Sequence, residues 1–200
     1  MTKCSVYLMV LLFLLGCDSK GGESKRSQVE SEKLKNEILE KQAAALEKQK
    51  QALADHANQM VQQISSQWDR VQGLYQKRMA AVSLLTRLLD FHQDKLTAKG
   101  AEAFAAVGDS SNLLEQADEA GTIDPAADDQ RFAEYEKMQD ALVMELEKLI
   151  NEIENIADLK VMPEYLNFRT EMESTGNLIA SERIGLNEKL EELKDLQAEK

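Results

Sequence analysis

Cysteine, proline and histidine are scarce in this sequence, and each shortage excludes a class of protein. There are two residues of each kind in 200. Cys4 and Cys17 are both near the start, so residues 18–200 cannot form a disulfide framework or a cysteine-ligated metal site. His56 and His92 each follow a leucine at the third preceding position, whereas a di-iron bundle requires glutamate there. The sequence therefore predicts no metal site.

Other catalytic patterns are missing as well. No segment alternates polar and apolar residues as a half-buried strand does, and no glycine-rich loop is suited to bind phosphate. Gly108-Asp109-Ser110 is similar to the nucleophile block of one lipase family, but no strand precedes it and no histidine follows it. Residues 124–129 lack the glycine and final glutamate of a calcium loop. We expect no catalytic residue and no enzymatic activity.

An apolar run near the start is the most informative segment. Lys3 precedes the run Val6–Leu15, which as a helix would rise about 15 Å, roughly half of a bilayer core. This length is typical of a signal peptide rather than a spanning helix. The four residues 14–17, Leu-Leu-Gly-Cys, resemble the lipobox of bacterial lipoproteins. The resemblance implies cleavage between Gly16 and Cys17, with residues 1–16 as the signal peptide and acyl chains such as palmitate attached to Cys17.

The lipobox also implies a location. Membrane attachment through acylated Cys17 requires no cofactor other than this covalent lipid. Asp18 resembles the signal that retains enterobacterial lipoproteins in the inner membrane. We therefore expect the outer, periplasmic face of the cytoplasmic membrane, with the outer membrane as the less favoured alternative. Residues 17–24, which include a Gly-Gly pair, are predicted to be a flexible tether.

Residues 25–52 are dense in Glu, Lys and Gln and carry few apolar side chains. Their apolar stripe is too thin to bury much surface, and we predict a charged helical stalk. A disordered spacer and a self-associating coiled coil that makes a homo-oligomer are the alternatives.

Residues 53–200 are predicted to form an all-α domain, an antiparallel bundle of three long helices and a short one. Helical spacing indicates a first helix running to about Thr97. We expect Asp109-Ser110-Ser111 to cap the short helix, Pro125 to begin the next and Pro163 to begin the last.

Several residues match the pattern of one known family. These residues are Asp158-Leu159-Lys160, Glu171 to Ala180 with Thr175 and Asn177, Arg183 and Asn187, and upstream Asn58, Val61, Trp68, Val71, Leu74 and Lys77-Arg78. They resemble the LemA family over roughly residues 53–191. The family's two Tyr-Asn pairs appear here as Ala57-Asn58 and Leu186-Asn187. The resemblance implies a membrane-anchored helical bundle exposed outside the cytoplasm, with the lipid replacing the usual N-terminal anchoring helix.

Two arginines fall on predicted core faces. Arg78 is seven residues from Val71, and Arg183 is four after Ile179. A guanidinium group there requires a carboxylate, and we expect Glu171, Glu173 or Asp69 to supply it and fix the register between helices. Asn58 and Asn187 are predicted to hydrogen-bond between helices, and Trp68 to fill the core.

Charge is distributed unevenly. Residues 18–99 contain 14 basic and 11 acidic residues, and residues 100–200 contain 9 and 25. Antiparallel helices of opposite charge balance attract one another, and an acidic chain is a poor nucleic-acid ligand. We expect a non-enzymatic scaffold or adaptor for an unidentified envelope protein. A structural lipoprotein tethering the membrane to the cell wall, as the final Lys200 would permit, is the alternative.

Overall fold

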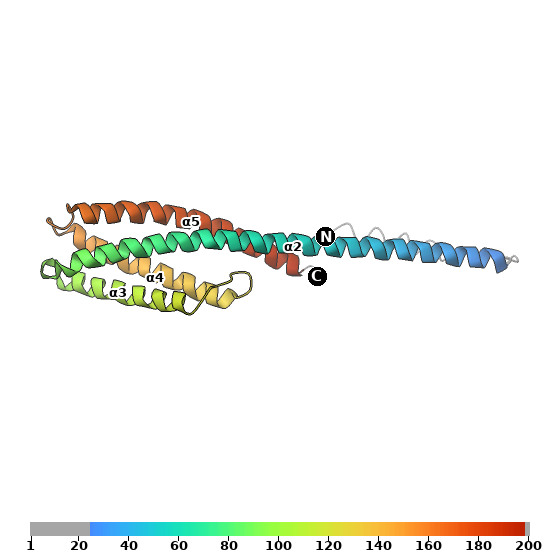
Figure 1. Cartoon of the computed structure of the whole chain (residues 1–200), viewed down its shortest axis with the longest axis horizontal. Helices are drawn as coiled ribbons and strands as arrows, with labels where there is room; N and C mark the ends of the chain where they lie inside the picture. Colours follow the sequence, from blue (N-terminus) through green and yellow to red (C-terminus); the bar gives the residue numbers. More distant parts are fainter. Residues whose placement is uncertain (1–24, 199–200) are drawn as a thin grey trace. The chain divides into compact units, whose positions relative to one another are not determined.

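A computed structural model describes residues 25–198, and their side chains from residue 32 onward. These residues form α-helices and one short 3-10 helix, with no strand among them, so the all-α bundle predicted from the sequence is confirmed (Figure 1). The elements in chain order are α2 (Lys25–Asp90), η1 (Gln93–Lys95), α3 (Ala98–Glu119), α4 (Asp129–Glu154) and α5 (Pro163–Ala198). The predictions for residues 1–24, including cleavage and lipidation at Gly16 and Cys17, lie outside the described residues.

The chain divides into two compact units, Met1–Ala52 and Leu53–Lys200. In the first unit, residues 25–52 are helical throughout. The helical conformation predicted for this segment agrees with the structure, and its role as a stalk stays a prediction. Among residues 32–52, four large apolar side chains are exposed: Leu34, Ile38, Leu39 and Leu46.

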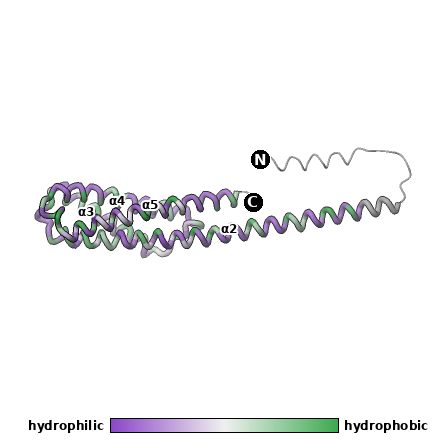
Figure 2. The backbone as a smooth tube through the Cα atoms, turned by 90° about the horizontal axis from the view of Figure 1, so that it is seen from above, coloured by the Kyte–Doolittle hydropathy of each residue, from purple (hydrophilic) through white to green (hydrophobic). Residues whose placement is uncertain are grey.

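The second unit is the bundle. Its core is made of apolar side chains that recur at helical spacing along α2, α3, α4 and α5, and Figure 2 shows hydrophobic and hydrophilic positions alternating along each helix. The largest fully buried members include Tyr75, Leu85, Leu142, Tyr165 and Leu186. Burial of this stripe, and not helix propensity alone, stabilises helices of this kind.

Trp68 of α2 lies at the centre of an aromatic cluster. Its ring centroid is 5.2 Å from that of Phe132, 5.9 Å from that of Tyr135 and 6.3 Å from that of Tyr75, each in an edge-to-face arrangement. Such pairs add about 0.5–1.5 kcal/mol each beyond their buried area. The cluster therefore binds α2 to α4, and Trp68 is a core residue, as the sequence indicated.

The junction between the first two bundle helices differs from the prediction. Helix α2 ends at Asp90 rather than near Thr97, and η1 follows. Thr97 is the N-cap of α3, where its hydroxyl accepts a hydrogen bond from the backbone N–H of Gly100 at 3.0 Å. Helix α3 continues through Asp109-Ser110-Ser111, so the predicted cap at these residues was wrong. The buried residues on both sides of them, from Ala103 to Leu114, keep one helical face against α4.

The predicted helix starts at the two prolines have different outcomes. Pro125 is buried in the turn before α4, and the helix begins only at Asp129, capped by the Asp128 carboxylate, which accepts from the Arg131 N–H at 3.0 Å. A carboxylate satisfies an otherwise unpaired amide at a helix start, which proline cannot do. The start predicted at Pro125 was therefore wrong. Pro163 is the first residue of α5, as predicted.

Candidate functional site

Polar side chains interrupt the core at one level of the bundle. Arg78 of α2 and Glu136 and Gln139 of α4 are buried there, next to Tyr75 and Tyr135. Tyr75 and Arg78 are three residues apart and therefore share one face of α2, and Glu136 and Gln139 do so on α4. Buried polar groups of this kind require partners to offset their loss of hydration.

The first half of this buried polar network centres on Glu136. Its carboxylate accepts a hydrogen bond from the Tyr75 hydroxyl at 2.5 Å and forms an ion pair with Nε of Arg183 in α5. Arg183 also donates from its two terminal nitrogens to the two carboxylate oxygens of Asp140, at 2.6 and 3.4 Å. One carboxylate thus joins three helices, and a planar guanidinium fixes the spacing between α4 and α5.

The second half centres on Arg78, which is far less well paired. Only 5% of the residue is exposed. Its Nη1 donates to the amide oxygen of Gln139 at 3.5 Å, and its guanidinium carbon lies 5.4 Å from the centre of the Tyr75 ring. Its buried Nε has no hydrogen-bond partner among the described residues. Gln139 in turn donates to the Tyr135 hydroxyl at 3.2 Å. A neutral amide and a ring face compensate a buried cation only in part.

Burial changes the acid–base behaviour of the network. It raises the pKa of Glu136, although the hydrogen bond from Tyr75 and the charge of Arg183 act in the opposite direction. Burial lowers the pKa of Arg78. It raises the pKa of Tyr75, and the adjacent Glu136 carboxylate adds to this shift. Burial likewise raises the pKa of Tyr135, and there the carboxylate that adds to the shift is that of Asp118. Each shift favours the neutral form, as expected for groups removed from water.

The arginine partners named from the sequence were wrong. Arg183 pairs with Glu136 and Asp140, and Arg78 with Gln139, instead of with Glu171, Glu173 or Asp69. The reason is geometric. Glu171 and Glu173 lie on α5 itself and are exposed, whereas α4 presents Glu136 and Asp140 one turn apart toward α5.

The remaining motif residues do not gather at this network. Thr175 is buried and its hydroxyl donates to the backbone oxygen of Glu171 at 2.7 Å, within its own helix. Asp158 accepts from the Lys95 ammonium at 3.1 Å, far along the bundle, and Lys160 is exposed. Asn177 is exposed and lines a pocket.

Asn58 and Asn187 are both exposed. Within residues 32–198, no hydrogen bond between helices involves either of them, so the structure does not support the interhelical role predicted for these asparagines.

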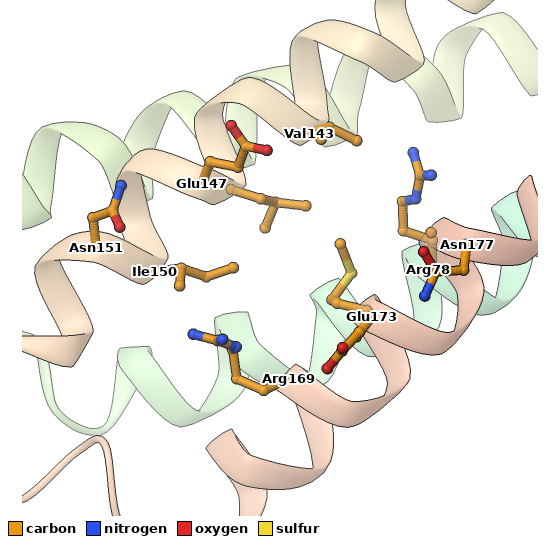
Figure 3. A pocket seen from close by; sticks show the side chains of 11 residues that line it. Arg78, Val143, Glu147, Ile150, Asn151, Arg169, Glu173 and Asn177 are labelled. Carbon is orange, nitrogen blue, oxygen red and sulfur yellow. The ribbon is translucent and has the colours of Figure 1, made fainter. Parts of the chain in front are cut away.

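A pocket of about 580 Å³ lies beside Arg78. Its walls are made by α4 and α5, with Arg78 reaching it from α2. Figure 3 shows Glu147 and Asn151 on the α4 side, Arg169 and Glu173 on the α5 side, and Arg78 with Asn177 toward one end. The pocket and the poorly paired half of the network share Arg78, and together they form the candidate functional site.

Two members of this site, Glu136 and Gln139, have a signal in the sequence. Glu136 and Gln139 occupy positions of the α4 apolar stripe, between Phe132 and Leu142, where every other member is hydrophobic or aromatic. A polar residue at such a position indicates a buried partner on another helix. Asp140 and Glu147 lie outside the stripe and carry no such signal.

Within residues 25–198 there is no group of three or more metal-binding side chains, and no helix in that range is long and apolar enough to cross a membrane.

Comparison with known proteins gives no match. No protein-family model, no curated protein and no solved structure matches this chain.

Proposed function

We propose that this protein is a membrane-anchored, LemA-like lipoprotein that serves as a non-enzymatic helical scaffold or adaptor for other envelope proteins. The observation that carries this proposal is the lipobox, Leu-Leu-Gly-Cys at residues 14–17, followed by a helix from Lys25. A cysteine at the end of a short apolar run is the expected site of acylation. Two or more acyl chains would hold the protein durably on a bilayer, since each buried methylene contributes about 0.8 kcal/mol.

The scaffold role is supported by an exposed helix face. Leu39 and Leu46 are seven residues apart and therefore lie on one side of α2, and they are 61% and 51% exposed. Exposed aliphatic residues at heptad spacing are typical of a helix that packs against another helix. Acidic bundle helices would at the same time disfavour direct contact with anionic lipid.

The anchor is tested by replacing Cys17 with serine in the full chain, with Cys4→Ser as the matched control. Both cysteines precede Lys25, where the first described helix begins, so neither change should affect the folding of the helices. We expect the C17S protein to leave the membrane fraction or remain as an uncleaved precursor, and to incorporate no labelled palmitate. The C4S protein should behave as wild type. Normal processing and labelling of C17S would refute the lipoprotein proposal.

The adaptor role is tested by crosslinking in cells. Leu39→Lys with Leu46→Lys places two charges on the exposed stalk face, and Leu113→Lys, on an exposed position of the bundle, is the control. We expect crosslinked partners of the wild-type protein to disappear only in the stalk variant. If the stalk variant retains every crosslink, the stalk face is not the contact surface. If the only crosslinked species is a dimer of the chain itself, the adaptor role is rejected in favour of a homo-oligomer.

A further inference from the structure

We propose that the pocket between α4 and α5 binds the free carboxyl end of a short peptide, with Arg78 pairing the carboxylate. This inference is independent of the lipid anchor and adds a ligand site to the bundle. It rests on three observations: an unsatisfied buried cation at the pocket, acidic and amide side chains around its opening, and an apolar wall between them.

The first observation is the state of Arg78. It is 95% shielded from solvent, and within residues 32–198 it forms no ion pair. Among the side chains that the structure describes, its Nε has no hydrogen-bond partner, and its one hydrogen bond is the 3.5 Å contact with Gln139. A buried guanidinium group with unfilled N–H donors binds a carboxylate strongly, because the two carboxylate oxygens can accept from two of its N–H groups at once. Arg183 has such a partner in Asp140, whereas no carboxylate of the described part of the chain forms an ion pair with Arg78.

The second observation is the set of polar residues around the pocket. Glu147 and Glu173 are exposed carboxylates on opposite walls, and Asn151 and Asn177 are exposed amides (Figure 3). The two glutamates repel a ligand that is only anionic, so the ligand should carry a positive group away from its carboxylate. The asparagine amides both donate and accept, which suits a peptide backbone.

The other arginine of the pocket is already paired. Arg169 donates to a carboxylate oxygen of Glu154 at 2.7 Å, and the Tyr165 hydroxyl donates to the same oxygen at 2.8 Å. Arg169 is therefore the weaker anchor for a carboxylate, and the charges of the site favour one orientation. The carboxyl end of the peptide would lie at Arg78 and its ammonium end near the glutamates.

The third observation concerns size and the apolar wall. The wall between the polar groups consists of Val143, Leu146, Ile150 and Met172. A volume of about 580 Å³ is within the range of pockets that hold small organic ligands, about 300–1,000 Å³. It fits a peptide of two or three residues with an aliphatic side chain against this wall.

Gly176 allows the pocket to be blocked without disturbing the bundle. A Cβ atom built on Gly176 meets nothing within 4 Å, and the residue lines the pocket. Gly108 of α3 has the same open surroundings and does not line it. Gly176→Leu should therefore fill the pocket, and Gly108→Leu is its matched control. Both changes replace a helical glycine by a better helix former.

The experiment is calorimetric titration of the detergent-solubilised full chain with the tripeptide Ala-Ala-Leu, and with the same peptide as its C-terminal amide. We expect the free acid to bind at least about tenfold more tightly than the amide, since only the acid offers a carboxylate to Arg78. G176L should lose binding and G108L should retain it. In Arg78→Gln, acid and amide should bind with equal affinity.

Three results would overturn the proposal. The first is no binding of the acid to the wild-type chain, and the second is equal binding of acid and amide. The third is unchanged binding by G176L. If Arg78→Gln does not fold, the comparison of G176L with G108L and of acid with amide still decides the matter. None of these results depends on Cys17, so they leave the proposed lipid anchor untouched.

Discussion

Gly185 of α5 lies so close to Gln67 of α2 that a Cβ atom at Gly185 would be 2.6 Å from the Gln67 amide nitrogen. That nitrogen donates to the backbone oxygen of Glu182 at 2.9 Å, and the amide oxygen accepts from the Lys189 ammonium at 2.6 Å. Gln67 is buried. The absence of a side chain at Gly185 thus lets a buried amide bond directly to the neighbouring helix.

This contact predicts opposite effects for two glycines of the same helix. Gly176→Ala should stabilise the bundle by about 0.5–1 kcal/mol, because nothing surrounds its Cβ position and alanine favours helix. Gly185→Ala should be less stable than Gly176→Ala by about 1–3 kcal/mol, because the Gln67 amide must move away from its buried partners. Urea denaturation followed by circular dichroism measures both. Equal stabilities of the two variants would mean that Gln67 moves aside without loss.

The ion pairs of the two arginines on α5 are expected to differ in strength. Arg183→Met should destabilise by about 2–4 kcal/mol, because it leaves the buried Glu136 carboxylate without a cation, whereas Arg169→Met should cost about 0–1 kcal/mol. Adding Glu136→Gln to Arg183→Met should restore part of the loss. A double-mutant cycle in urea measures the coupling, and additive effects would show that the two groups do not interact.

The buried tyrosines predict a loss of stability in alkali. Burial and the adjacent Glu154 raise the pKa of Tyr165 to about 12, and the pKa values of Tyr75 and Tyr135 are raised further. A tyrosine that keeps its proton only when folded lowers the free energy of unfolding as the pH rises above about 10, by up to about 1.4 kcal/mol per pH unit. Tyrosinate absorbance should therefore appear together with unfolding. Full titration of all three near pH 10 in a folded chain would contradict this.

Trp68 should be the most sensitive apolar position of α2. Trp68→Ala removes the ring that contacts Phe132, Tyr135 and Tyr75 and is expected to cost about 3–5 kcal/mol. Trp68→Phe should cost less, because most of the edge-to-face contact survives. Thermal denaturation of both variants gives the comparison. A Trp68→Ala chain as stable as Trp68→Phe would show that the cluster contributes little.

The sequence predicted the helices well where apolar periodicity is long and continuous. The helical bundle of residues 53–200 and the start of α5 at Pro163 were predicted correctly. Helix starts were missed where short polar signals compete. Asp109-Ser110-Ser111 has the composition of a cap, yet burial of Val107 and Leu114 keeps these residues inside α3. Tertiary burial outweighed a local preference of about 1 kcal/mol.

The site was predicted only in part. The spacing of Arg78 from Val71 placed it correctly on the core face, because helical period is a local property. Its poor pairing, the Arg183–Glu136 contact and the pocket depend on how α2, α4 and α5 are aligned along the bundle. Alignment is set by many side chains at once, as at Gly185, and no short segment encodes it.

The pairing of Gln67 with Glu182 joins residues 115 positions apart in the chain. During synthesis, α2 is therefore completed long before α5, with which it packs, has been made. A nascent fragment that stops short of α4 would leave Trp68 without Phe132 and Tyr135, and one that stops short of α5 would leave Gln67 without Glu182. Such intermediates are prone to aggregate and are typical clients of chaperones. The risk of aggregation is therefore highest in the interval between the synthesis of α2 and the synthesis of α5.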